Sequence, residues 1–189
     1  MFEIRFNLVL IALASLCWAA LSAHSVEPIL EAPELAELRR VEANAARSGA
    51  PDDLVVLSEA YLSRGFPALA VVALRAAEPH HLEVPAVAHQ LARAYEQSGR
   101  LIDALATADL ALVRCSRVLG ARFLSTQVPP YGCSERTLAK LDMHKGALER
   151  MARWGIVDPR SDPRAQRAYD LALRRARIAI GELAEPATP

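Results

Sequence analysis

The sequence is poor in several residue types that define whole classes of protein. Its 189 residues include only 3 cysteines and 8 glycines, and aromatic residues make up 5%. So few cysteines and glycines exclude a disulfide-rich miniprotein and a collagen-like fibre, while 52% hydrophobic residues argue against disorder. Because 22 basic residues balance 22 acidic ones, the net charge is zero, and we expect no nucleic-acid partner.

Motifs for catalysis and for metal or cofactor binding are missing as well. The sequence holds no H-E-x-x-H or C-x-x-C pattern, no glycine-rich phosphate loop and no Gly-x-Ser-x-Gly. The adjacent His80 and His81 follow Pro79 in a predicted loop, where two solvated side chains are the simplest interpretation. We therefore predict no catalytic residues, no metal site and no cofactor. A hydrolase or cell-wall-active enzyme with dispersed catalytic residues is the alternative from another functional class.

Alanine, in contrast, is abundant, with 36 copies. Since alanine is the best helix former and runs of β-branched residues are few, the composition predicts an all-α protein. The length suits one domain or one short repeat array. Twenty arginines against two lysines, together with so much alanine, are typical of high-GC bacterial coding.

The N-terminal segment is predicted to be a targeting signal. Residues 6–23 carry no charge and follow Arg5, and Leu21-Ser22-Ala23 is the expected cleavage site. Two alternatives stay open: an uncleaved anchor, because eighteen apolar residues almost span a bilayer, and a lipoprotein attached through Cys17. All three export the remaining chain. We predict a periplasmic or secreted protein, with anchoring in the inner membrane through residues 6–23 as the alternative.

Cysteine usage agrees with export. Removing residues 1–23 leaves Cys115 and Cys133, and an even count in an exported chain favours a disulfide. The bridge would close a loop of about 18 residues and stabilise the fold by roughly 3 kcal/mol in the chain-entropy model. The alternative is two free, buried thiols.

A 34-residue period runs through the middle of the chain. Placing residues 51–84 over residues 85–118 aligns eight identical pairs without a gap. Leucine and tyrosine four residues apart share one helix face, and a glycine stands where the first helix must end and turn. The period therefore predicts two consecutive helix–turn–helix units. The identical pairs are Pro51/Pro85, Leu57/Leu91, Ala60/Ala94, Tyr61/Tyr95, Gly65/Gly99, Ala70/Ala104, Ala77/Ala111 and Val84/Val118.

This pattern resembles the tetratricopeptide repeat, a helix–turn–helix unit of the same length. The resemblance covers residues 51–118 and is incomplete, because Leu54 and Ala88 replace the family's tryptophan, and Leu74 and Ala108 replace its second aromatic residue. It implies a short α-solenoid, a tetratricopeptide-like array of helical hairpins after the N-terminal segment.

Further helices are predicted on both sides of the two repeats. Residues 24–50 form a linker and a cap helix with proline near its start and glycine just past its end. Residues 119–133 contain Val128–Gly132 and are predicted to be an irregular loop. Residues 134–184 are predicted to be a divergent third hairpin, with helix N-caps at Ser134 and Asp162, and residues 185–189 a tail.

The resemblance also implies a function, because the first helices of successive units in this family line a concave groove that binds protein segments. Only Arg93 supplies a cation there, so the groove lacks the charge of family members that clamp carboxylates. We predict an adaptor or scaffold in the bacterial envelope; the runner-up is a membrane-anchored subunit of a larger envelope assembly. The groove positions carried over are Asp52, Val55, Glu59, Leu62, Ser63, Ala86, His89, Arg93, Glu96 and Gln97.

Charge is distributed unevenly along the chain. Residues 24–112 carry 13 acidic and 7 basic side chains, whereas residues 113–189 carry 8 acidic and 14 basic ones. Four arginines of the second half approximate one helix face: Arg164, Arg167, Arg174 and Arg175. This face is either simply solvated or contacts an acidic partner, an anionic membrane or the acidic half of a neighbouring copy in self-association.

Overall fold

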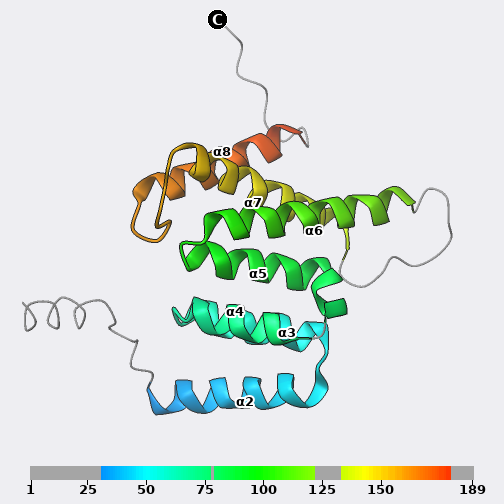
Figure 1. The fold of residues 1–189 in the computed structure, drawn as a ribbon, viewed down its shortest axis with the longest axis vertical. Coiled ribbons are helices and arrows are strands. Elements are labelled where there is room, and N and C mark those ends of the chain that lie inside the picture. The colour runs from blue at the N-terminus through cyan, green and yellow to red at the C-terminus, as the bar shows by residue number, and fades with distance from the viewer. Residues whose placement is uncertain (1–30, 78, 122–132, 180–189) are drawn as a thin grey trace, which may run out of the picture. The chain divides into compact units, whose positions relative to one another are not determined.

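The chain is entirely helical over the residues that the computed structural model describes, which are 31–77, 79–121 and 133–179. This confirms the all-α prediction (Figure 1). The predicted signal segment, most of the predicted loop and the C-terminal tail lie outside the described residues. The elements are α2 (Ala32–Ser48), α3 (Pro51–Ser63), α4 (Pro67–Ala76), the 3-10 helix η1 (Pro79–Glu83), α5 (Pro85–Gln97), α6 (Leu101–Ala121), α7 (Glu135–Arg153) and α8 (Pro163–Ala179).

Local sequence explains where these helices begin and end. Prolines open α3, α4 and α5, where a missing backbone N–H costs no hydrogen bond. The Ser134 side chain caps α7 by accepting a hydrogen bond from the Thr137 backbone N–H at 3.1 Å. The repeated glycines, Gly65 and Gly99, follow α3 and α5 with φ of 79° and 74°, a conformation that disfavours any side chain.

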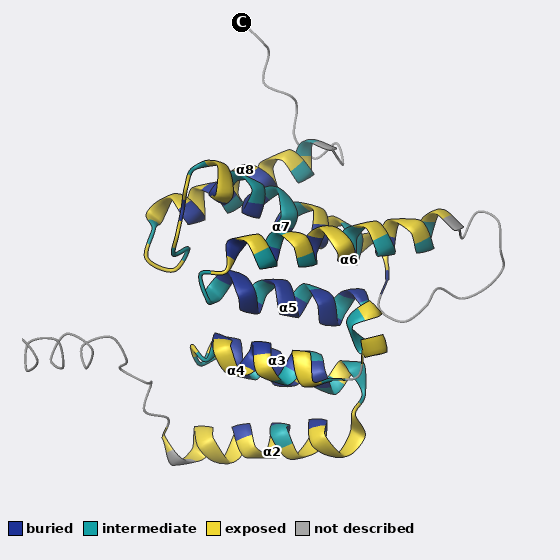
Figure 2. Cartoon of the chain, in the orientation of Figure 1, coloured by how far each residue is buried: buried dark blue, intermediate teal, exposed yellow. Residues whose placement is uncertain are grey.

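The helices pack mainly on their neighbours in sequence. Each helix from α2 to α8 contacts the next one, and η1 lies against α5. In addition α3 contacts α5, and α5 contacts α7, so the first helices of successive pairs lie side by side (Figure 1). This places α5 at the centre of the packing, and it is buried along most of its length (Figure 2).

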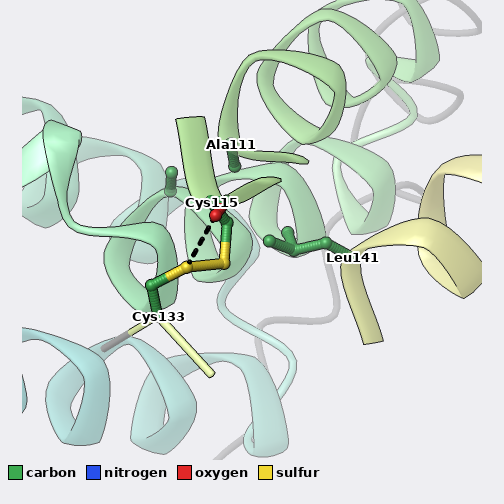
Figure 3. Packing of buried hydrophobic residues seen from close by; sticks show 5 residues of the cluster. Ala111, Cys115, Cys133 and Leu141 are labelled. Atoms are coloured by element: carbon green, nitrogen blue, oxygen red, sulfur yellow. Dashed lines mark hydrogen bonds between the residues drawn. A yellow bond between two sulfur atoms is a disulfide. The ribbon is translucent and has the colours of Figure 1, made fainter. Parts of the chain in front are cut away.

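A disulfide joins the end of the second helix pair to the start of the third. Cys115 on α6 and Cys133, which precedes α7, are bonded with their Cα atoms 5.5 Å apart, in agreement with the predicted pairing. Both cysteines are buried with Ala88, Ala111 and Leu141 (Figure 3). The Cys133 Sγ atom also lies 3.1 Å from the Cys115 carbonyl oxygen, a contact rather than a donated hydrogen bond because oxidised sulfur carries no proton.

Helix α6 extends further than the sequence predicts. The 34-residue period ends the second repeat at residue 118 and leaves a loop after it, but α6 continues to Ala121. Leu112, Val118 and Leu119 pack against the cluster around the disulfide. This apolar contact keeps the last turn helical, since tertiary packing supplies most of the stability of a helix end.

Candidate functional site

The neighbouring faces of α3 and α5 carry the predicted groove residues that remain accessible. Arg93 donates from Nη1 to Glu59 Oε1 at 3.3 Å and to Gln90 Oε1 at 3.0 Å. Glu59 and Arg93 are 34 residues apart, so they occupy the same position in successive helix pairs. Val55 and Ala86 are half-buried; the polar residues that are accessible or partly accessible are Asp52, Glu59 and Ser63 on α3, and His89, Arg93 and Gln97 on α5. We refer to these six residues as the α3–α5 face.

Two other predicted groove residues are inside the protein. Leu62 and Glu96 are 6% and 7% exposed. They too are 34 residues apart and therefore hold one repeat position, but their roles differ. Leu62 belongs to the apolar core, whereas Glu96 is part of an internal polar cluster that also includes His144 and Tyr169.

The internal polar cluster joins three helices. The Oε2 atom of Glu96, on α5, lies 2.9 Å from Nε2 of His144, on α7, and accepts a hydrogen bond from the Tyr169 hydroxyl of α8 at 2.6 Å. Because a carboxylate only accepts, Nε2 of His144 carries the donated proton. The Nδ1 atom of the same ring is buried and has no hydrogen-bond partner among the described residues. The cluster thus holds one carboxylate in a fixed orientation.

Burial and nearby charges keep the side chains of His89 and Tyr169 uncharged. His89 packs edge-on against His144, with the ring centroids 5.1 Å apart. Burial is the largest cause that lowers the pKa of His89 to about 3, and electrostatic interactions with His144, Arg93 and Lys140 add to it. Burial and the Glu96 carboxylate raise the pKa of Tyr169, so its hydroxyl stays protonated and donates to Glu96.

Two of the cavities among the described residues bear on the candidate site. The larger, of about 650 Å³, lies among α2, α3, α4 and the histidine pair His80–His81. In its wall Tyr61 donates to Glu42 at 2.7 Å, and burial together with this carboxylate raises the pKa of Tyr61 to about 12. The smaller, of about 310 Å³, is lined by Glu96, by residues 159–163 and by the first two turns of α8; we refer to it as the α5–α8 cavity.

The four arginines of the predicted basic face are all exposed on α8. Arg164 pairs with Asp162 at 2.6 Å and also donates to the Trp154 carbonyl at 3.2 Å, so it holds the start of the helix. Arg167, Arg174 and Arg175 have no acidic partner within the described ranges. Three charges of this face are therefore available to solvent or to an anionic partner.

Sequence reasoning missed His144 and Tyr169 as companions of Glu96. His144 and Tyr169 lie 48 and 73 residues after Glu96, so the 34-residue period gives no reason to bring them together. A signal was present, however. His144 stands between Leu141 and Leu148 on the apolar face of α7, and a polar residue on a buried face needs a partner.

Neither a metal-binding group nor a membrane-spanning helix among the described residues, nor a similar known protein, adds to this geometry. Over residues 31–77, 79–121 and 133–179, no group of three or more His, Cys, Asp or Glu side chains is arranged to hold a metal ion. No helix in those ranges has both the length and the apolar character needed to cross a bilayer. Comparison with protein-family models, curated proteins and solved structures finds no match. Any function assigned to the chain rests on its own residues.

Proposed function

We propose that the chain is an exported tetratricopeptide-like repeat protein that binds a segment of a partner protein on its α3–α5 face. The observation that carries this proposal is the ion pair between Glu59 and Arg93. Residues one period apart meet there side by side, as a repeat array requires. The pair is solvent-exposed and contributes under about 1 kcal/mol, so it marks the register between repeats rather than stabilising them.

The composition of this face suits a peptide. Glu59 and Arg93 offer charges of both signs, and Ser63 and Gln97 offer hydrogen-bond donors and acceptors from one end of the helices. Helices packed on α5 from both sides hold these groups in place before a ligand arrives. A preorganised surface of this kind loses little entropy when it binds.

Two features support export to the bacterial envelope. The uncharged run at residues 6–23 has the character of a signal or anchor segment. The disulfide between Cys115 and Cys133 suits an oxidising compartment, since disulfides rarely persist in a reducing cytoplasm. Sequencing the mature N-terminus distinguishes a cleaved signal from an uncleaved anchor, because a start near His24 means cleavage and an intact start means anchoring.

Site-specific photo-crosslinking in the native envelope tests the binding face. We expect a crosslinkable residue at Ser63 or Gln97 to trap a partner, and one at the exposed Arg75 of α4 to trap none. Replacing Glu59, Arg93 and Gln97 by alanine should abolish the adduct. The matched triple replacement of Arg75, Ser116 and Arg117, exposed on α4 and α6, should preserve it. Equal adducts from Arg75, or an adduct that survives the first triple replacement, contradict the proposal.

A further inference from the structure

The α5–α8 cavity lies beside the α3–α5 face but is built from other elements. Glu96 is its lining residue from α5, and the connection between α7 and α8 and the first two turns of α8 supply the rest of the lining. That connection is held against the turn between α5 and α6, where a Cβ on Gly99 would lie 3.3 Å from the Val157 carbonyl oxygen. The start of the connection that lines the cavity is therefore packed against the turn that follows α5.

Glu96 presents one carboxylate oxygen to this cavity. Its Oε2 atom is occupied by two donors, His144 and Tyr169. Its Oε1 atom accepts no hydrogen bond from any described residue, yet it is not enclosed by protein. Because Glu96 lines the cavity and is only 7% exposed, the small accessible part of this residue borders the cavity. A fixed, nearly buried lone-pair acceptor thus stands in its wall.

No other charge of the cavity wall balances this carboxylate. Asp162 is bound by Arg164 at 2.6 Å, and Arg160 is paired with Asp158, with 3.6 Å between the charged atoms. His144 pairs with the other carboxylate oxygen, Oε2, at 2.9 Å and is not part of the cavity wall. A carboxylate with so little exposure is costly unless a cation pairs with it, so the cavity favours a positively charged guest.

The remaining wall indicates which cation fits. Pro159, Pro163 and Ala165 contribute apolar atoms, which suit the methylene stem of a long side chain. A guanidinium group prefers to bind both oxygens of a carboxylate, but Oε2 is already saturated. A compact ammonium group needs only one oxygen and matches Oε1.

We propose that the α5–α8 cavity binds the ammonium group of a lysine side chain presented by the partner. This inference rests on the proposed function, because it gives the bound segment a chemical class: a peptide that carries a lysine beside the residues held on the α3–α5 face. Glu96 is the recognition residue. His144 and Tyr169 are positioning residues that turn its free oxygen toward the cavity.

Amide chemical shifts of the purified, oxidised protein test the site with a small probe, Nα-acetyl-lysine N-methylamide. We expect saturable shifts in the second half of α5, in residues 159–163 and in the first turns of α8. The Nε-acetylated form of the probe, which lacks the charge, should cause none. The corresponding arginine derivative should bind about tenfold more weakly, because only one oxygen is available to it.

Two variants separate recognition from folding. Glu96→Gln keeps the shape of the side chain but removes its charge, and should weaken lysine binding by roughly 30-fold or more, as for loss of one partner of a buried charge pair. Gln166→Trp fills the cavity from an exposed position on α8, leaves Glu96 intact and should abolish the shifts. Leu171→Trp, an exposed position of α8 outside the cavity, should bind lysine like the wild type.

Three results would overturn the lysine site: no binding of the lysine probe, equal shifts from the lysine and acetyl-lysine probes, or wild-type binding by Gln166→Trp. None of these results depends on an envelope partner. If the probe binds as expected but photo-crosslinking at Ser63 and Gln97 fails, the lysine site stands and the proposed function falls. If crosslinking succeeds and the probe does not bind, the reverse holds.

Discussion

Acid should destabilise this protein through His89, well above the pH at which carboxylates titrate. The pKa of His89 is lowered from 6.5 to about 3 in the folded protein, chiefly by burial. Between these values the unfolded chain binds a proton that the folded chain rejects, so stability falls as the pH falls. From about pH 7 to about pH 5 the single histidine should remove about 2 kcal/mol from the free energy of unfolding.

Urea unfolding followed by circular dichroism at both pH values measures this loss. His89→Gln removes the titrating group, so its stability should fall by about 2 kcal/mol less than that of the wild type over the same interval. His80→Gln, an exposed replacement in η1, is the matched control and should behave like the wild type.

Imidazole NMR signals give a direct test of the same idea. The His89 ring should remain neutral in the folded protein at about pH 5, because its folded pKa lies about two units lower. The reasoning is refuted if His89 protonates near its ordinary pKa in the folded protein, or if the wild type and His89→Gln lose stability in parallel.

Three further changes test the structure. Replacing both Cys115 and Cys133 by serine should cost roughly 3 kcal/mol and make the thermal midpoint insensitive to reductant; an unchanged midpoint would speak against the bridge. Gly99→Ala should lower the free energy of unfolding, measured by chemical denaturation, by about 1–2 kcal/mol. The control Gly120→Ala lies in helical backbone, where an added Cβ would meet no atom within 4 Å, so it should be neutral or stabilising. A larger loss for Gly120→Ala than for Gly99→Ala contradicts the turn geometry. Ser134→Ala should cost about 1 kcal/mol by the same measurement, and a neutral result removes the cap.

The 34-residue period of the sequence made much of the fold predictable. A glycine at one offset in both units marks a turn that only glycine adopts easily, and Gly65 and Gly99 both have positive φ. The same offset of 34 residues separates Glu59 from Arg93, which form an ion pair. A periodic sequence indicates its own contacts, because residues one period apart must meet wherever neighbouring units pack alike.

The period could not predict the internal polar cluster, because the cluster joins the second helix pair to α7 and α8, where the period no longer holds. The repeat position of Glu96 predicts an open groove, but α7 and α8 bring His144 and Tyr169 over it. The third hairpin has no counterpart in the first two, so no internal comparison predicts what it covers. Leu62 and Glu96 show the result: one repeat position is apolar in one unit and an oriented carboxylate in the next.

The disulfide also determines how the chain carries mechanical force. Tension passing from α6 to α7 runs through the bond between Cys115 and Cys133, so the residues between them bear none of it. When a single oxidised molecule is pulled from its ends, the unfolded chain should be shorter by roughly 60 Å than the reduced one, from about 18 residues of extended backbone. The disulfide thus sets the maximum end-to-end length of the oxidised, unfolded chain.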